Sequence, residues 1–179
     1  MQQTGNTQIW TIPLDAQAGQ LKVGKPEPFI KDQLNGAQPS FSPDGKWLAY
    51  VSTEAGAIPE VYVWPFPAQP PGQGGKWVIS NQGGERPVWS RTSHDLLYLT
   101  PGGQIMAASY TVKGDTFIAD KPRVWLAKLG GTDFDLSPDG KRLAVVTPVE
   151  TSQAQKADHL VVFLQNFFDE LRRRVPTSN

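Results

Sequence analysis

Cysteine is absent from this 179-residue chain, which excludes disulfide frameworks, thiolate metal sites and cysteine nucleophiles. No apolar run approaches the roughly 20 residues of a membrane-spanning helix, so membrane insertion is not expected. Charge of one sign is also lacking, because 17 Lys and Arg balance 17 Asp and Glu. Binding to nucleic acid is therefore not expected, since it needs a clustered positive excess.

Glycine, proline and aromatic residues are abundant instead, with 17 Gly, 16 Pro, six Trp, eight Phe and four Tyr. This composition favours many short strands joined by tight turns. The length is sufficient for a single domain with a sizeable core, spanning residues 1–179.

A repeated segment decides the fold class. "SFSPDGKWLAYVS" at 40–52 returns as "DLSPDGKRLAVVT" at 135–147, and a degenerate copy around Ser90 lies between them. Ser42 and Ser90 are 48 positions apart, and Ser90 and Ser137 are 47 apart. The middle copy lacks the Pro-Asp-Gly but keeps the flanking apolar runs. A degenerate copy that falls in register with two good ones indicates a repeating fold.

Each unit is a hairpin followed by two more strands. Proline presets a type I turn, aspartate tolerates the next position, and glycine supplies the positive φ that follows. Third strands are predicted at 60–66, 104–112 and 159–164, and fourth strands at 76–80 and 123–127. Four antiparallel strands every ~45 residues are typical of β-propeller blades.

The expected fold is all-β: a β-propeller fragment of about three four-stranded blades, half of a six-bladed ring, with a short C-terminal helix. The predicted segments are a partial blade 8–34, blades 36–81 and 83–128, a partial blade 131–164 and a helix 166–175. Propellers need about four to eight blades to close. We therefore expect a homodimer in which each copy lends its N-terminal strands to the other; the alternative is that the natural protein is longer.

The segments "QPSFSPDGKWLAYVS" and "FDLSPDGKRLAVVT" resemble the blades of TolB-type, WD-repeat-like six-bladed propellers of the PD40 kind. The ending "NFFDELRRRVP" is similar to the end of propellers attached to bacterial, especially acidobacterial, serine/threonine protein kinases. The resemblance implies a sensing or protein-interaction module with a protein or peptide partner. It implies no kinase activity, because the phosphate loop and both catalytic kinase motifs are missing.

The compartment stays open on the sequence alone. No secretory signal is recognisable at the start of the sequence, which as written is consistent with a cytoplasmic protein. A sensor domain derived from a membrane kinase would instead be extracytoplasmic.

The sequence contains few residues that could act in catalysis, and no cofactor is expected. His94 is interpreted as a turn residue and His159 as a strand-end residue. No Gly-x-Ser-x-Gly nucleophile is present. Two alternatives remain open: the gating propeller fragment of a prolyl-oligopeptidase-like peptidase, and a channel-ligand-binding or hydrolytic propeller.

Three further patterns are better explained by structure than by function. Asp133, Asp135 and Asp139 do not match a calcium loop. The arginines at 172–174 are interpreted as solvated cations at a helix end. The proline-rich stretch at 64–72 is interpreted as a rigid connector.

One set of polar positions is a candidate binding site. Gln38, Arg86 and Asp133 each precede a repeat serine by four residues, at the predicted start of an innermost strand. In a propeller these positions ring one mouth of the central channel. We therefore expect them to contact a small ligand or a peptide.

Overall fold

The computed structural model describes residues 7–17, 20–30, 35–68 and 75–148. The chain divides into two units, residues 1–148 and 149–179, and the described residues all belong to the first. The strand predicted at 159–164 and the helix predicted at 166–175 lie outside the described residues. Within the described ranges, no helix is long and apolar enough to cross a membrane.

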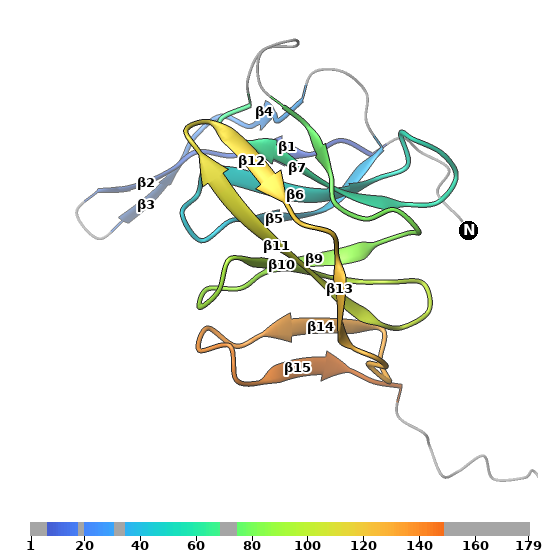
Figure 1. Cartoon of the computed structure of the whole chain (residues 1–179). Helices are drawn as coiled ribbons and strands as arrows, with labels where there is room; N and C mark the ends of the chain where they lie inside the picture. Colours follow the sequence, from blue (N-terminus) through green and yellow to red (C-terminus); the bar gives the residue numbers. More distant parts are fainter. Residues whose placement is uncertain (1–6, 18–19, 31–34, 69–74, 149–179) are drawn as a thin grey trace, which may run out of the picture. The chain divides into compact units, whose positions relative to one another are not determined.

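The first complete sheet has four antiparallel strands in sequential order (Figure 1). They are β5 (Gly36–Phe41), β6 (Trp47–Ser52), β7 (Glu60–Pro65) and β8 (Trp77–Val78). Every residue of β6 is buried, as expected for an apolar run that packs on both faces of a sheet.

The second complete sheet repeats this order and adds a hairpin. Its strands are β9 (Glu85–Trp89), β10 (Asp95–Leu99), β11 (Ile105–Lys113) and β13 (Arg123–Leu126). β12 (Thr116–Ala119) pairs with the far end of β11. The sequence pattern predicts no strand at this position. Gly114, with φ 59°, makes the turn that returns the chain along β11.

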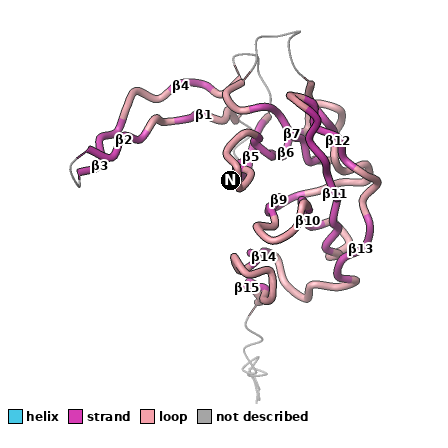
Figure 2. The backbone as a smooth tube through the Cα atoms, turned by 60° about the vertical axis from the view of Figure 1, so that its left-hand side comes forward, coloured by secondary structure: helices cyan, strands magenta, loops and turns pink. Residues whose placement is uncertain are grey.

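Two smaller pieces flank these sheets. After them in the chain, β14 (Asp133–Leu136) pairs with β15 (Leu143–Val146). Before them, β1 (Trp10–Thr11) pairs with β4 (Glu27–Pro28), and β2 (Leu14–Gln17) pairs with β3 (Gln20–Val23) (Figure 2). The β2–β3 hairpin was not predicted either.

The N-terminal piece repeats the outer part of the second sheet at a displacement of 96 positions. Its residue pairs Trp10–Pro28 and Leu14–Val23 correspond to Met106–Val124 and Tyr110–Ala119. The hydrogen bond from Gly24 N–H to the Pro13 carbonyl likewise corresponds to that from Asp120 to Ser109. β1 to β4 are therefore the third strand, hairpin and fourth strand of a blade.

The repeat serines hold the predicted turns. Ser42 Oγ accepts the Trp47 N–H at 3.0 Å and donates to Asp44, while its carbonyl accepts the Gly45 N–H at 2.9 Å. Gly45 has φ 69° and Gly140 has φ 70°, which confirms the positive φ predicted for both glycines. The same hydrogen bonds recur around Ser137.

The core consists of two clusters, each between neighbouring sheets. The first joins β6 and β7 to β9, β10, β11 and β12 and is rich in aromatic rings, among them Trp47, Trp89, Tyr110 and Phe117. Trp89 Nε1 also donates to the Ser40 carbonyl across the two sheets at 2.9 Å. The second cluster joins β10 and β11 to β14 and β15. Sequential four-stranded antiparallel sheets that pack face to face confirm the all-β class and a partial β-propeller.

Candidate functional site

The three predicted site residues lie on the first strands of three consecutive sheets. Gln38 is in β5, Arg86 in β9 and Asp133 in β14. β9 contacts both β5 and β14. Only Asp133 begins its strand as predicted, because Gln38 is the third residue of β5 and Arg86 the second of β9.

These side chains form one connected polar row. Gln38 Oε1 accepts the Arg86 backbone N–H at 2.6 Å. The Arg86 guanidinium donates through Nη1 to Asp133 Oδ2 at 2.9 Å. Asp133 Oδ1 accepts the N–H of Phe134 at 2.8 Å. The structure therefore brings together three residues that the repeat alignment selected from positions almost a hundred residues apart.

Backbone conformation also distinguishes this row. Gln38 and Arg86, with φ 53° and 56°, are the two non-glycine residues that have positive φ in the described ranges. Residues other than glycine rarely adopt a positive φ. The pairing of β5 with β6 shifts register between Ala37 and Ser40, and such bulges redirect a side chain. Neither position is occupied by glycine or asparagine, the residue types that would signal a positive φ in the sequence.

The row is partly open to solvent. The side chains of Arg86 and Asp133 are 35% and 41% exposed, so their ion pair contributes little to stability. Arg86 Nε is buried and has no hydrogen-bond partner. The row thus combines fixed positions with unused hydrogen-bonding capacity.

The other sequence candidates do not converge on this row. His94 lies in the turn before β10, where its ring meets Tyr110 edge-on at 5.5 Å. Asp135 accepts the N–H of Leu136, and Asp139 is engaged in the turn at Ser137. Among the described residues, no group of three His, Asp or Glu side chains could hold a metal ion. His159 and the arginines at 172–174 lie outside the described residues, as does part of the 64–72 stretch.

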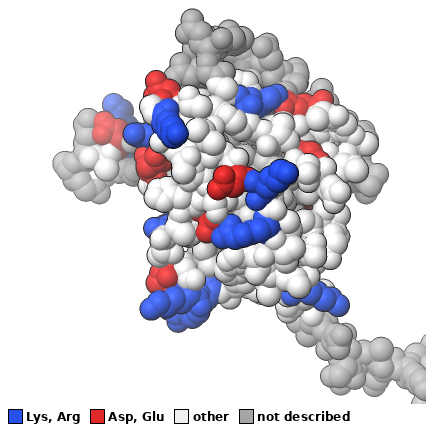
Figure 3. Space-filling model, in the orientation of Figure 1, with Lys and Arg blue, Asp and Glu red and all other residues white. Residues whose placement is uncertain are grey.

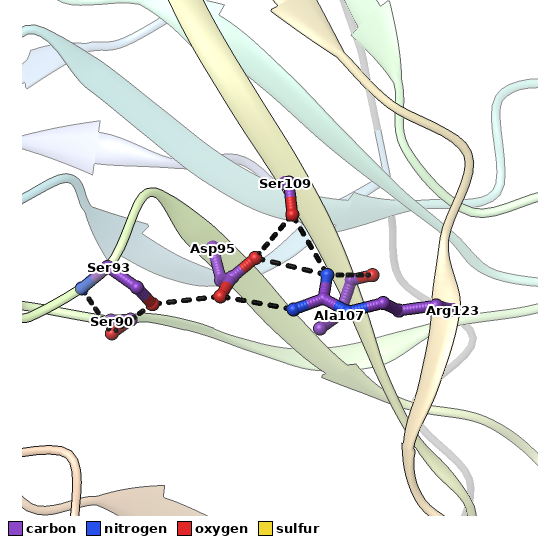
Figure 4. Close-up of polar contacts among 6 residues, drawn as sticks. All are labelled: Ser90, Ser93, Asp95, Ala107, Ser109 and Arg123. Atoms are coloured by element: carbon purple, nitrogen blue, oxygen red, sulfur yellow. Dashed lines mark hydrogen bonds and ion pairs between the residues drawn. The ribbon is translucent and has the colours of Figure 1, made fainter.

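A second polar cluster surrounds Asp95 and was not found from the sequence (Figure 4). Its Oδ1 accepts from Ser109 Oγ at 2.7 Å and from Arg123 Nη1 at 3.2 Å. Its Oδ2 accepts from Ser93 Oγ at 2.8 Å and from Arg123 Nη2 at 3.3 Å. Burial alone would raise the pKa of Asp95, but the hydrogen bonds from Arg123, Ser109 and Ser93 lower it below its ordinary value.

On the face shown in Figure 3, basic and acidic side chains are interspersed rather than gathered by sign. A face with interspersed charges does not by itself attract a highly charged polymer.

No protein-family model matches this chain, and no curated protein matches it. Among solved structures, the chain is similar to the crystal structure of TolB from Acinetobacter baumannii, at 20% sequence identity and a TM-score of 0.48. The match covers 79% of this chain and 35% of the TolB chain. The chain thus spans about a third of the length of that protein.

Proposed function

We propose that this chain is a non-enzymatic interaction or sensing scaffold that completes its propeller ring as a homodimer. The observation that carries the scaffold role is the polar row of Gln38, Arg86 and Asp133, which are held on the first strands of three sheets. Rigid sheets that present fixed polar groups suit recognition of a partner.

A peptide or protein segment is the class of partner that fits this row. Arg86 donates hydrogen bonds to carbonyl or carboxylate oxygens, and Asp133 accepts them from amides or amines. A peptide offers both kinds of group along one backbone. The balanced charge of the row does not favour a strongly acidic or strongly basic ligand.

The binding role is tested with an array of immobilised peptides, followed by calorimetry on the strongest binder. The variant combines Gln38→Ala, Arg86→Ala and Asp133→Ala. The control combines Lys113→Ala, Asp115→Ala and Lys128→Ala, all at exposed positions outside the row. We expect the row variant to raise Kd by roughly tenfold or more, which corresponds to about 1.4 kcal/mol, while the control stays near the wild type. Equal binding by both variants would remove the proposed site.

Ring completion is tested separately by the molecular mass in solution. Two copies of the strands described here supply six blades, because β14–β15 and β1–β4 are complementary parts of one blade. Sedimentation equilibrium of the cysteine-free chain should give twice the mass of one chain. A dispersed monomer at high concentration would contradict the homodimer.

The sensing role draws on the resemblance to kinase-attached propellers. The C-terminal segment that carries this resemblance lies outside the described residues. The "SPDG" turns, which lie within them, carry only the resemblance to TolB-type blades. A peptide found on the array would then be tested as a stimulus for a kinase fused to this domain. Turnover of ester, peptide or glycoside substrates by the purified chain would instead favour an enzyme.

A further inference from the structure

The N-terminal piece has one covered face and one bare face. On the second sheet, Phe117 faces the first sheet and is 1% exposed. Its equivalent in the N-terminal piece, Leu21, is 64% exposed. The other residues on this face of the piece are exposed in the same way: Trp10, Ile12 and Leu14. Ile9, Thr11 and Phe29 are less exposed, and Phe29 stacks on Phe66 beside the first sheet.

β15 has a bare edge and a bare face as well. Its Val146 is 59% exposed, whereas the equivalent Leu99 of β10 is 8% exposed. In the second sheet, β10 pairs with β9 on one side and β11 on the other. Among the described strands, β15 pairs with β14 alone, and β1 pairs with β4 alone.

The two bare pieces are complementary parts of one blade. β14 and β15 occupy the places of β9 and β10, and β1 to β4 occupy those of β11 to β13. We propose that β1 of a second copy pairs antiparallel with the free edge of β15, with Thr11 opposite Ala144. This inference rests on the proposed homodimer and specifies its interface.

The register follows from the second sheet. There, Leu97 lies opposite Ala107, and Tyr98 lies opposite Met106. The equivalents of Leu97 and Tyr98 in β15 are Ala144 and Val145, by the 47-position repeat. The equivalents of Ala107 and Met106 in β1 are Thr11 and Trp10, by the 96-position repeat. Thr11 therefore lies opposite Ala144, and Trp10 opposite Val145. A slip of one residue would turn each apolar side chain to the wrong face.

A second copy fits this edge better than the segment that follows β15 in the chain. The next strand predicted from the sequence begins at residue 159, thirteen positions after Val146. By contrast, β7 begins eight positions after Ser52, and β11 begins six positions after Leu99. A second copy also covers the bare face of the N-terminal piece, which a strand supplied by residues 159–164 would leave exposed.

The same equivalence places the second copy's hairpin. Phe117 contacts Trp47 and Trp77 of the first sheet, at ring-centroid distances of 5.2 and 5.7 Å. The corresponding positions of the second sheet are Asp95 and Arg123, as the strand registers require. The second copy's Leu21 therefore packs over the Asp95 cluster drawn in Figure 4.

The chain offers a clean test because it contains no cysteine. Directly opposed residues of antiparallel strands have Cα atoms about 4.5–5.5 Å apart, which lies within the range of a disulfide. Thr11→Cys and Ala144→Cys are prepared as separate full-length chains, mixed, and oxidised mildly. Only the mixture should yield a disulfide-linked species of twice the mass, and each variant alone should yield none. A mixture of Ala144→Cys with Gln20→Cys, at the hairpin end of β3, is the matched control.

Three outcomes distinguish the proposed Thr11–Ala144 register from the proposed homodimer. A linked dimer in the Thr11–Ala144 mixture alone supports the register. A dimeric mass with no disulfide, or with equal yield in the control mixture, overturns the register but leaves the homodimer standing. A monomeric mass with no disulfide overturns both, while binding of a peptide by the polar row stays testable on the monomer.

Discussion

The second complete sheet and the split pieces that copy it show what a neighbouring sheet contributes. Tyr110 and Phe117 of the complete sheet are buried, whereas Leu14 and Leu21 occupy the same register positions and are exposed. Their strand pairings and turn hydrogen bonds are equivalent. Local structure is therefore the same in both regions, and the difference in burial comes from the sheet that packs, or does not pack, against each.

The largest expected effect is a loss of stability on substitution of Phe117, which is buried between the two complete sheets. Phe117→Ala removes a ring that contacts Trp47, Trp77, Trp89 and Tyr110. We expect the free energy of unfolding to fall by about 3–5 kcal/mol, the usual cost of such a cavity. Urea unfolding followed by tryptophan fluorescence measures it.

The matched variant is Leu21→Ala, at the exposed position that corresponds to Phe117. In dilute solution, where the copies are apart, it should change the free energy of unfolding by less than about 0.5 kcal/mol. At concentrations that favour the dimer it should weaken association. A loss in the dilute monomer as large as that of Phe117→Ala would contradict the comparison.

The repeat serines extend the comparison to the turns. Ser42 is buried and accepts the Trp47 N–H, so Ser42→Ala leaves a buried donor unpaired and should cost about 1–3 kcal/mol. Ser137 makes equivalent hydrogen bonds beside the exposed strand β15, where water replaces them. Ser137→Ala should therefore cost less than about 1 kcal/mol. Equal losses in urea unfolding would show that burial does not set the difference.

Low pH should reduce the free energy of unfolding, because Asp95 in the second sheet becomes protonated. The pKa of this carboxyl is lowered in the folded chain, so the folded state holds the proton less tightly than the unfolded state, where the pKa is about 3.9. Its contribution is complete above that value and is lost as the pH falls through the lower folded pKa. Unfolding measured between about pH 5 and 2 should show this loss, and Asp95→Asn should reduce the slope. Asp115→Asn, at an exposed turn, serves as the control. An equal reduction of the slope in both variants would show that the Asp95 cluster is not its source.

A small effect on stability is also expected at the polar row. Arg86→Ala removes an ion pair whose two side chains are both partly exposed. The free energy of unfolding should change by less than about 1 kcal/mol. A much larger loss in thermal unfolding would mean that the row is chiefly structural, which would weaken its proposed binding role.

Several features could be predicted because they depend on residues close together in the chain. The Ser-Pro-Asp-Gly turns carry their own hydrogen-bond partners and their own glycine, so local chemistry is sufficient to specify them. Alternating turns and apolar runs also predicted the sequential sheets. The repeat spacing alone aligned Gln38, Arg86 and Asp133, which the structure joins in one row.

Other features were missed because their signals are weak or lie far apart. The hairpins β2–β3 and β11–β12 continue a third strand past its usual end. The short polar turn within each hairpin is only a weak sequence signal for it. The Asp95 cluster joins residues from β10, β11 and β13, and no local motif links them. The positive φ of Gln38 and Arg86 arises where the first strands bulge against their neighbours.

The repeat, the turns and the all-β blades follow from the amino-acid sequence, because each of these is specified by residues within one unit. Which apolar faces are buried and which are exposed becomes apparent only in the folded chain, since burial depends on the neighbouring sheet. The tertiary structure also supplied the strand registers by which β1 to β4 match β11 to β13, and β14 and β15 match β9 and β10. That relation depends on strand register across the chain, which local pattern does not carry.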